Sequence, residues 1–143
     1  MGQIQHSTEL PAAPEKVWAI IADPQTWDRW FTIHGSWLSE PPASLSAGAH
    51  LTEKVVMLGM ANKIEWTVDA YEEPTTLRLS GTGMAGVKTS FSFGLKPSDT
   101  GSIISIEAEF SGAMIVGALG KAVEKDSGKQ LEASLAKLTE LAA

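Results

Sequence analysis

Residues 87–110 read VKTSFSFGLKPSDTGSIISIEAEF, and this stretch decides the fold. Apolar and polar side chains alternate from Val87 to Leu95, and they alternate again from Ile104 to Phe110. A period of two is typical of a strand with one buried face. Between the two runs, the segment 97–101 is made of turn-forming residues. The stretch therefore predicts an antiparallel hairpin that turns one face toward the core.

Further strands are predicted on the N-terminal side of this hairpin. The clearest alternation is at residues 63–69, and weaker runs are at residues 3–10, 51–58 and 76–80. In residues 51–58 the sequence does not show which alternate side chains face inward, because the run ends in consecutive apolar residues. We expect Trp37 and Leu38 to start one more strand, and we expect Gly59 to Asn62 to form a turn. Strand signals about 10–15 residues apart favour an antiparallel meander.

Three helices are predicted. Pro14 suits the first turn of a helix that ends near Asp23-Pro24, where an N-cap aspartate and a proline start a second, brief helix. The second helix should bring Trp27, Trp30 and Phe31 close together. The third helix is predicted from Met114 to Ala143, because apolar residues recur there at helical spacing. These residues are Ile115, Leu119, Val123, Leu131, Leu135 and Leu138.

The predicted fold class is α+β, as one domain over residues 1–143. A curved antiparallel sheet of about seven strands surrounds a long C-terminal helix, with two short helices after the first strand. The apolar face of the sheet must be covered, and the C-terminal helix is the only large apolar partner. A strongly curved sheet around a single helix leaves a gap between them, so we expect a ligand cavity there.

The composition excludes several kinds of site. The chain has no cysteine and a net charge of −6. Cysteine-based zinc sites and thiol nucleophiles are therefore absent, and no nucleic-acid partner is expected, since such a partner needs a basic patch. The sequence has neither a signal-peptide pattern nor an apolar run of about 18 residues. We therefore expect a cytoplasmic protein without a transmembrane segment.

The histidines and carboxylates show no spacing typical of a metal or catalytic site. His6, His34 and His50 are far apart, and none has a carboxylate at ligand spacing, so no metal or cofactor is expected. We interpret His6 as a core histidine bonded to the backbone. His34 is the best candidate for an acid, a base or a ligand contact, with a surface-loop position as the alternative. No catalytic pair of carboxylates is predicted, and Glu53 can be assigned to neither face.

One glycine motif needs a separate interpretation. Residues 81–86, GTGMAG, match the G-x-G-x-x-G pattern of dinucleotide sites. That pattern requires a helix directly after the motif, whereas the residues from Val87 onward alternate as a strand does. We therefore interpret the motif as a hairpin turn.

Bulky apolar side chains are more numerous than a thin layer of sheet and helix needs, and they are our candidates for ligand binding. Binding pockets are mostly apolar, and methionine adapts to irregular shapes. Four side chains should shape the mouth of the cavity: Trp27, Trp30, Phe31 and Trp37. The others should line its interior: Met57, Trp66, Phe91, Phe93, Phe110, Met114, Leu119 and Val123. For any single residue, ordinary core packing is the open alternative.

The stretch PEKVWAIIADP at residues 14–24, followed by Trp27 and Trp30, resembles the opening of the START-like or SRPBCC superfamily. The resemblance covers nearly the whole chain. It implies the helix-grip fold, which polyketide cyclases, dehydrases and lipid-transport proteins share.

A narrower resemblance rests on residues 30–34 (WFTIH), 59–66 (GMANKIEW) and 81–87 (GTGMAGV). These segments are similar to an actinobacterial branch labelled as SRPBCC-type toxins of type II toxin–antitoxin pairs. This resemblance implies an antitoxin protein as a partner.

Binding of a small hydrophobic ligand, such as a lipid or a polyketide, is the primary functional expectation. The first alternative is the toxin of a toxin–antitoxin pair. The second is an enzyme similar to a polyketide cyclase or aromatase, for which His34, Tyr71 and Thr89 are the only catalytic candidates. A protein-binding module without any ligand is the third, and a completely filled interior would favour it.

Overall fold

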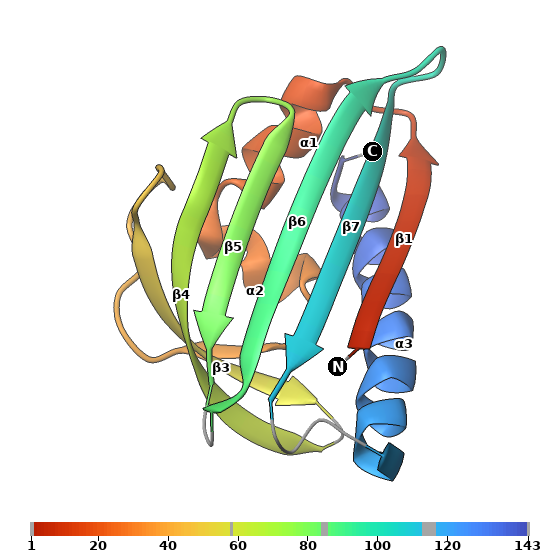
Figure 1. Ribbon diagram of the computed structural model, residues 1–143. Helices are drawn as coiled ribbons and strands as arrows, with labels where there is room; N and C mark the ends of the chain where they lie inside the picture. Colours follow the sequence, from red (N-terminus) through yellow and green to blue (C-terminus); the bar gives the residue numbers. More distant parts are fainter. Residues whose placement is uncertain (1, 58, 84–85, 113–116, 143) are drawn as a thin grey trace.

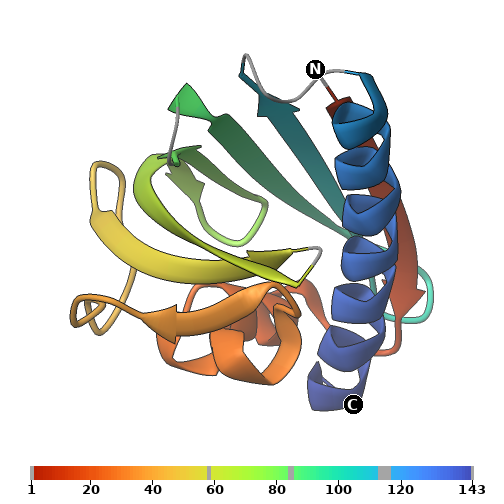
Figure 2. The same ribbon diagram turned by 90° about the horizontal axis from the view of Figure 1, so that it is seen from below.

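The computed structural model describes residues 2–57, 59–83, 86–112 and 117–142. The elements along the chain are β1 (Gly2–Leu10), α1 (Pro14–Ile21), the 3₁₀ helix η1 (Pro24–Thr26), α2 (Trp27–Trp30), β2 (His34–Trp37), β3 (His50–Met57), β4 (Met60–Glu72), β5 (Thr76–Thr82), β6 (Lys88–Pro97), β7 (Ser102–Ser111) and α3 (Gly117–Ala142). The strands form one antiparallel sheet in the order β1-β7-β6-β5-β4-β3-β2. Figures 1 and 2 show this sheet curling beside α3, so the predicted helix-grip fold is confirmed.

The β6–β7 hairpin forms as its alternation predicts. Phe93 lies opposite Ile106 and Leu95 opposite Ile104, and all four side chains are buried. Ser92 lies opposite Glu107 on the outer face of the sheet. This register turns the apolar side chains of both strands toward α3 and their polar side chains toward solvent.

The helical signals near the N-terminus are also confirmed. Pro14 is at the start of α1, and the Asp23 carboxylate accepts a hydrogen bond of 3.0 Å from the backbone N–H of Gln25 at the start of η1. The indole N–H of Trp27 donates to the carbonyl oxygen of Ile21 over 3.0 Å. This bond attaches α2 to the end of α1 and turns the Trp27 ring inward.

Two predicted boundaries were wrong. Trp37 ends β2 and does not start it, because the strand already begins at His34. The expected turn at Gly59 to Asn62 is shorter, because β4 begins at Met60, which lies opposite Met57. Gly59, with φ of 74°, lies in the tight connection between these strands.

The inward face of α3 is apolar in its second half, where Leu131, Leu135 and Leu138 are buried. The first half departs from the prediction. Leu119 is 36% exposed, and Val123 is only partly buried at the edge of the core. The fully buried residues of α3 begin at Ser127, and before them Val123 packs only against the edge of the core. The predicted interior residue Met114 lies outside the described residues. None of the described helices is long and apolar enough to cross a membrane.

Candidate ligand-binding site

The inner face of the sheet carries a continuous cluster of aromatic rings with Phe91 at its centre. The rings of Phe31, Trp66 and Phe110 meet Phe91 edge-on, at centroid distances of 5.4, 5.6 and 6.0 Å. Phe93 is next to it on β6. Edge-to-face contacts are the favoured arrangement of aromatic pairs. The fold therefore brings together five residues of the predicted ligand-binding set. Phe31 directly follows α2, and the other four lie on β4, β6 and β7.

The residues expected at the mouth of the cavity lie deeper than predicted. Trp27, Trp30 and Phe31 are 0%, 1% and 3% exposed, so none of them borders an opening. Trp37 is half-buried, with its ring 5.4 Å from that of Trp27. The short η1–α2 segment points its aromatic rings inward, so this cluster fills one end of the core.

A small cavity separates the aromatic cluster from α3. Its volume is about 10 Å³, and its lining is Phe31, Ile33, Met57, Phe91, Phe110, Ser127, Gln130, Leu131 and Ser134. A cavity needs roughly 10–15 Å³ to hold a single water molecule. Sheet and helix are therefore closely packed around these described lining residues.

The helix side of this cavity is polar, although the sheet side is not. Thr32, in the segment after α2, bonds to α3: its backbone N–H donates to Ser134 Oγ over 3.0 Å, and its hydroxyl donates to the carbonyl oxygen of Gln130 over 3.0 Å. Ser127, two turns earlier on α3, is 3% exposed, and its hydroxyl has no hydrogen-bond partner among the described residues. One wall of the cavity thus presents a buried hydroxyl that is free to bond.

A buried polar network lies beside the cluster, on β2, β3 and β4. Glu53 is completely buried on the inward parity of β3. One of its carboxylate oxygens pairs with His34 Nδ1, and the other accepts a hydrogen bond of 2.8 Å from the indole N–H of Trp66. The side chain of His34 is only 3% exposed, and its ring lies 4.9 Å from that of Trp37. Burying a carboxylate is costly unless it is paired and hydrogen-bonded, and both conditions are met here.

Sequence reasoning missed this network. The sequence indicated no partner for His34, and the surface-loop position for this residue was wrong, because its side chain is buried against Glu53. The two residues are 19 positions apart and meet only because β2 and β3 are antiparallel neighbours, with His34 opposite Val55. The parity of Glu53, which the sequence left open, is inward because Leu51 and Val55 are also buried.

The three catalytic candidates do not converge. His34 lies on the edge strand β2 and is paired with Glu53. Tyr71 packs edge-on against Trp18 of α1, at a centroid distance of 5.3 Å, near the far end of β4. Thr89 is buried on β6, opposite Gly81 of β5. Its hydroxyl has no hydrogen-bond partner among the described residues. These three described side chains therefore do not surround a common reaction centre.

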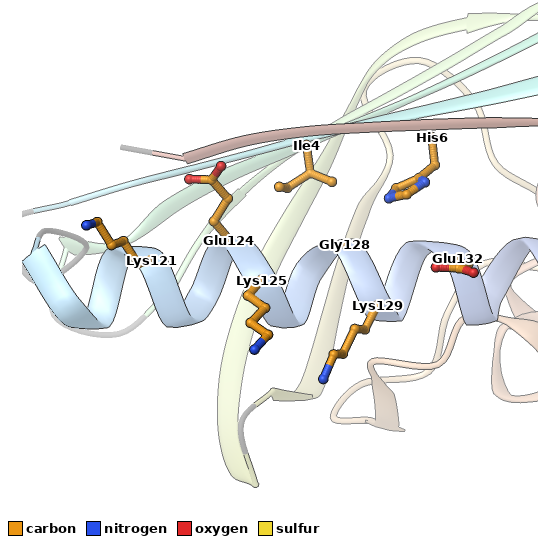
Figure 3. A pocket seen from close by; sticks show the side chains of 8 residues that line it. All are labelled: Ile4, His6, Lys121, Glu124, Lys125, Gly128, Lys129 and Glu132. Atoms are coloured by element: carbon orange, nitrogen blue, oxygen red, sulfur yellow. The ribbon is translucent and has the colours of Figure 1, made fainter.

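A larger and more polar hollow of about 550 Å³ lies between β1 and α3, lined by Ile4, His6, Lys121, Glu124, Lys125, Gly128, Lys129 and Glu132. Figure 3 shows Ile4 and His6 pointing from β1 toward the helix, while Lys125 and Lys129 point away from β1. His6 is half-buried in this hollow, so our interpretation of it as a core residue was wrong. The charged groups do not converge on one point, and the lining does not suit an apolar ligand.

The remaining motifs have structural roles. Gly81 is the second-last residue of β5, Gly83 follows this strand, and Gly86, with φ of 76°, precedes β6. The glycine motif therefore joins two antiparallel strands as predicted. In the part of the chain that the structure describes, no three His, Asp or Glu side chains gather in a way that could hold a metal ion.

Comparisons with known proteins agree with this architecture. A family model described as polyketide cyclase / dehydrase and lipid transport matches residues 1–143. A relative named Toxin Rv0910 from Mycobacterium tuberculosis is 32% identical over 123 residues, which is 86% of this chain and 85% of the relative. The uncharacterized protein Rv1546 from the same organism is 27% identical over 141 residues, which is 99% of each chain.

Among solved structures, a START superfamily protein from Mycobacterium smegmatis superposes with a TM-score of 0.80 at 16% identity, covering 99% of this chain and 97% of the other. At this sequence identity, the structural similarity is evidence for the fold alone.

Proposed function

We propose that this chain binds a small apolar molecule between the sheet and α3. The premise is that the chain belongs to the polyketide cyclase / dehydrase and lipid-transport family of START-like proteins. The observation that carries the proposal is the unpaired hydroxyl of Ser127 on the wall of the interior cavity. A buried polar group without a partner costs about 1–3 kcal/mol. A ligand with a hydroxyl or carbonyl group would satisfy Ser127 and place its apolar body against the aromatic cluster.

We infer that α3 moves away from the sheet on binding, because the described residues around Ser127 leave a cavity of only about 10 Å³. Typical ligand sites are about 300–1,000 Å³. The hydrogen bonds that hold this closed state together are those of Thr32 to Gln130 and Ser134, which connect the α2–β2 segment to the helix. The ligand must compensate for the loss of these bonds, which favours molecules with a large apolar area, such as fused rings or acyl chains.

The direct test is native mass spectrometry of the full chain purified from its own host, followed by titration with oleic acid and with a hydroxylated anthraquinone. We expect a co-purified adduct, and a change in the emission of the buried tryptophans on titration. Absence of any adduct, together with unchanged emission for both probes, would contradict ligand binding. That result would favour the protein-binding alternative.

Replacing Ser127 by alanine is expected to raise the stability of the ligand-free protein by about 1 kcal/mol, because it removes a buried hydroxyl that has no partner. The same change should weaken binding of the anthraquinone probe by about tenfold, the effect of one lost hydrogen bond. Urea unfolding followed by tryptophan fluorescence measures the first effect, and titration measures the second.

Ser134→Ala is the matched control, since Ser134 is equally buried on the same helix but is bonded to Thr32. This variant should lose stability, so the two serine variants are expected to change it in opposite directions. A loss of stability in Ser127→Ala would show that its hydroxyl is bonded in solution, contrary to the proposal.

The relative named as a toxin favours a second candidate function, in which this chain arrests growth and is neutralised by an antitoxin protein. Strong inducible expression in a mycobacterial host should then stop growth, and co-expression of a small neighbouring reading frame should restore it. Unaffected growth at high protein levels would overturn this candidate and leave the ligand proposal intact.

A further inference from the structure

The two outer strands of the sheet, β1 and β2, differ in how open their free edges are. An edge strand has a row of backbone N–H and C=O groups without partners, and proteins block such a row with proline, lysine, a bulge or a very short strand. β2 has this protection, because it has only four residues and its register with β3 shifts between His34 and Ser36. β1 has nine residues, pairs with β7 in an unbroken register and contains neither proline nor lysine. Its free edge can therefore accept another strand.

No other strand of the described chain pairs with the free edge of β1. Its strand neighbour is β7, and among the described residues the hydrogen bonds of its backbone are those of that ladder. Figure 1 shows β1 at the side of the sheet, with α3 behind it. The hollow of about 550 Å³ separates the two, and Gly128, which has no side chain, lies where the helix approaches His6 (Figure 3). The helix thus leaves room beside the strand.

We propose that β1 pairs antiparallel with β1 of a second copy of this chain, so that the two sheets join into one. A twofold axis at His6 uses almost the whole length of the strand. On the outer face it places Gln3 opposite the partner's Glu9 and Gln5 opposite the partner's Ser7, and the side chains of both pairs can hydrogen-bond. Like charges do not face each other, because Glu9 is the only acidic residue of β1 and the strand has no lysine or arginine.

On the inner face, the same axis brings the hollows of the two copies together. Ile4 lies opposite the partner's Thr8 and His6 opposite the partner's His6, so these half-buried side chains cover one another. Because the axis is perpendicular to the sheet, the two α3 helices lie on the same face, one on each side of the paired strands. The hollows then form one groove to which both chains contribute. The lining of the interior cavity includes no residue of β1, so this inference does not rest on the proposed function.

A second copy is the occupant that this edge selects. Pairing β1 with itself uses both open edges at once, so the assembly closes as a dimer. Pairing β1 with β2 of another copy would leave an open edge at each end and continue into a fibre. The four residues and shifted register of β2 oppose that second arrangement. The difference between the two edges therefore favours a closed dimer.

The first test is sedimentation velocity of the full chain from low to high micromolar concentration. The monomer has a mass of 15.2 kDa, and we expect a species of twice this mass whose share rises with concentration. A monomer at every concentration overturns the proposal, and so does a continuous series of larger species.

Two lysine substitutions on the outer face of the sheet give a matched comparison. Ser7→Lys should weaken dimerisation by about tenfold, because it places two lysines diagonally across the axis and removes the hydroxyl that faces the partner's Gln5. Ser92→Lys makes the same change on β6, two strands away from the edge, between Arg78 and Glu107. It should leave the dimer unchanged. Equal dimerisation of the two variants contradicts pairing through β1.

Cross-linking tests the register, since the chain has no cysteine of its own. In His6→Cys the two thiols face each other at the axis, where opposite Cα atoms are about 4.5–5.5 Å apart, within the range of disulfides. With oxidised glutathione as the oxidant, this variant should form a covalent dimer. His50→Cys, an exposed position on β3, measures cross-linking by random collision. Equal cross-linking of both variants, or a dimer that His6→Cys does not cross-link, contradicts the proposed pairing.

Discussion

Replacing Glu53 by alanine is expected to lower the free energy of unfolding by about 3–5 kcal/mol, because buried hydrogen-bonding groups lose their partner and a void is left in the core. The substitution takes the hydrogen-bond acceptor from the indole N–H of Trp66 and the carboxylate partner from His34, and both groups remain buried. It also leaves a void in a completely buried position. Urea unfolding followed by tryptophan emission measures the loss.

Glu53→Gln separates hydrogen bonding from charge. The amide oxygen can still accept from Trp66, and its NH₂ group can donate to Nδ1 of a neutral His34, so we expect a loss of only about 1 kcal/mol. Glu65→Ala, on the outer face of β4, is the control for removing a carboxylate from the sheet and should change stability by less than about 0.5 kcal/mol. Equal losses for the alanine and glutamine variants of Glu53 would mean that its hydrogen bonds contribute nothing.

The Glu53 network also explains how β2 is held in place. This strand has only four residues, and its pairing with β3 shifts register between His34 and Ser36. The contact between His34 and Glu53 fastens this irregular edge strand to the interior of the sheet. In Glu53→Ala we therefore expect the backbone amides of β2 to lose protection from hydrogen exchange before those of β6 and β7 do.

Most of the fold could be predicted from local patterns. Alternation at residues 87–95 and 104–110 specified both strands of the central hairpin, because one buried face leaves a period of two in the sequence. Asp23-Pro24 predicted a helix start, and the physical reason is local. The Asp23 side chain accepts a hydrogen bond as the N-cap, and Pro24 lacks the backbone N–H that would have no partner in the first turn. The helical spacing of Leu131, Leu135 and Leu138 likewise predicted the buried face of α3.

The candidate site was harder to predict, because its contacts join residues that no local pattern connects. The depth of Trp27 and Trp30 depends on how α2 packs, and four residues of helix have no periodicity that could show it. Leu119 fits the helical spacing but precedes the part of α3 that meets the core. The volume between α3 and the sheet depends on their separation, which no single residue determines.

Gly81→Ala is expected to destabilise the protein by about 1–3 kcal/mol, as overpacking of a core does. In the sequence this glycine belongs to a turn motif, but in the structure it lies inside β5, opposite Trp66. A Cβ atom at this position would come within 2.7 Å of Ile64 Cγ2 and 2.8 Å of Trp66 Cε3. Something must shift, and moving the indole strains its hydrogen bond to Glu53. The measurements are urea unfolding and the emission maximum of the tryptophans.

Gly94→Ala on β6 provides the control, because a Cβ at that position meets no heavy atom of the described residues within 4 Å apart from its chain neighbours. It should leave stability unchanged or raise it by up to about 1 kcal/mol, since glycine weakens a strand. Combining Gly81→Ala with Glu53→Ala tests whether both changes act through Trp66. Their joint loss should then be smaller than the two separate losses together, whereas independent sites give additive effects. Additivity within experimental error would mean that the glycine makes room for Trp66 without fixing its bond to Glu53.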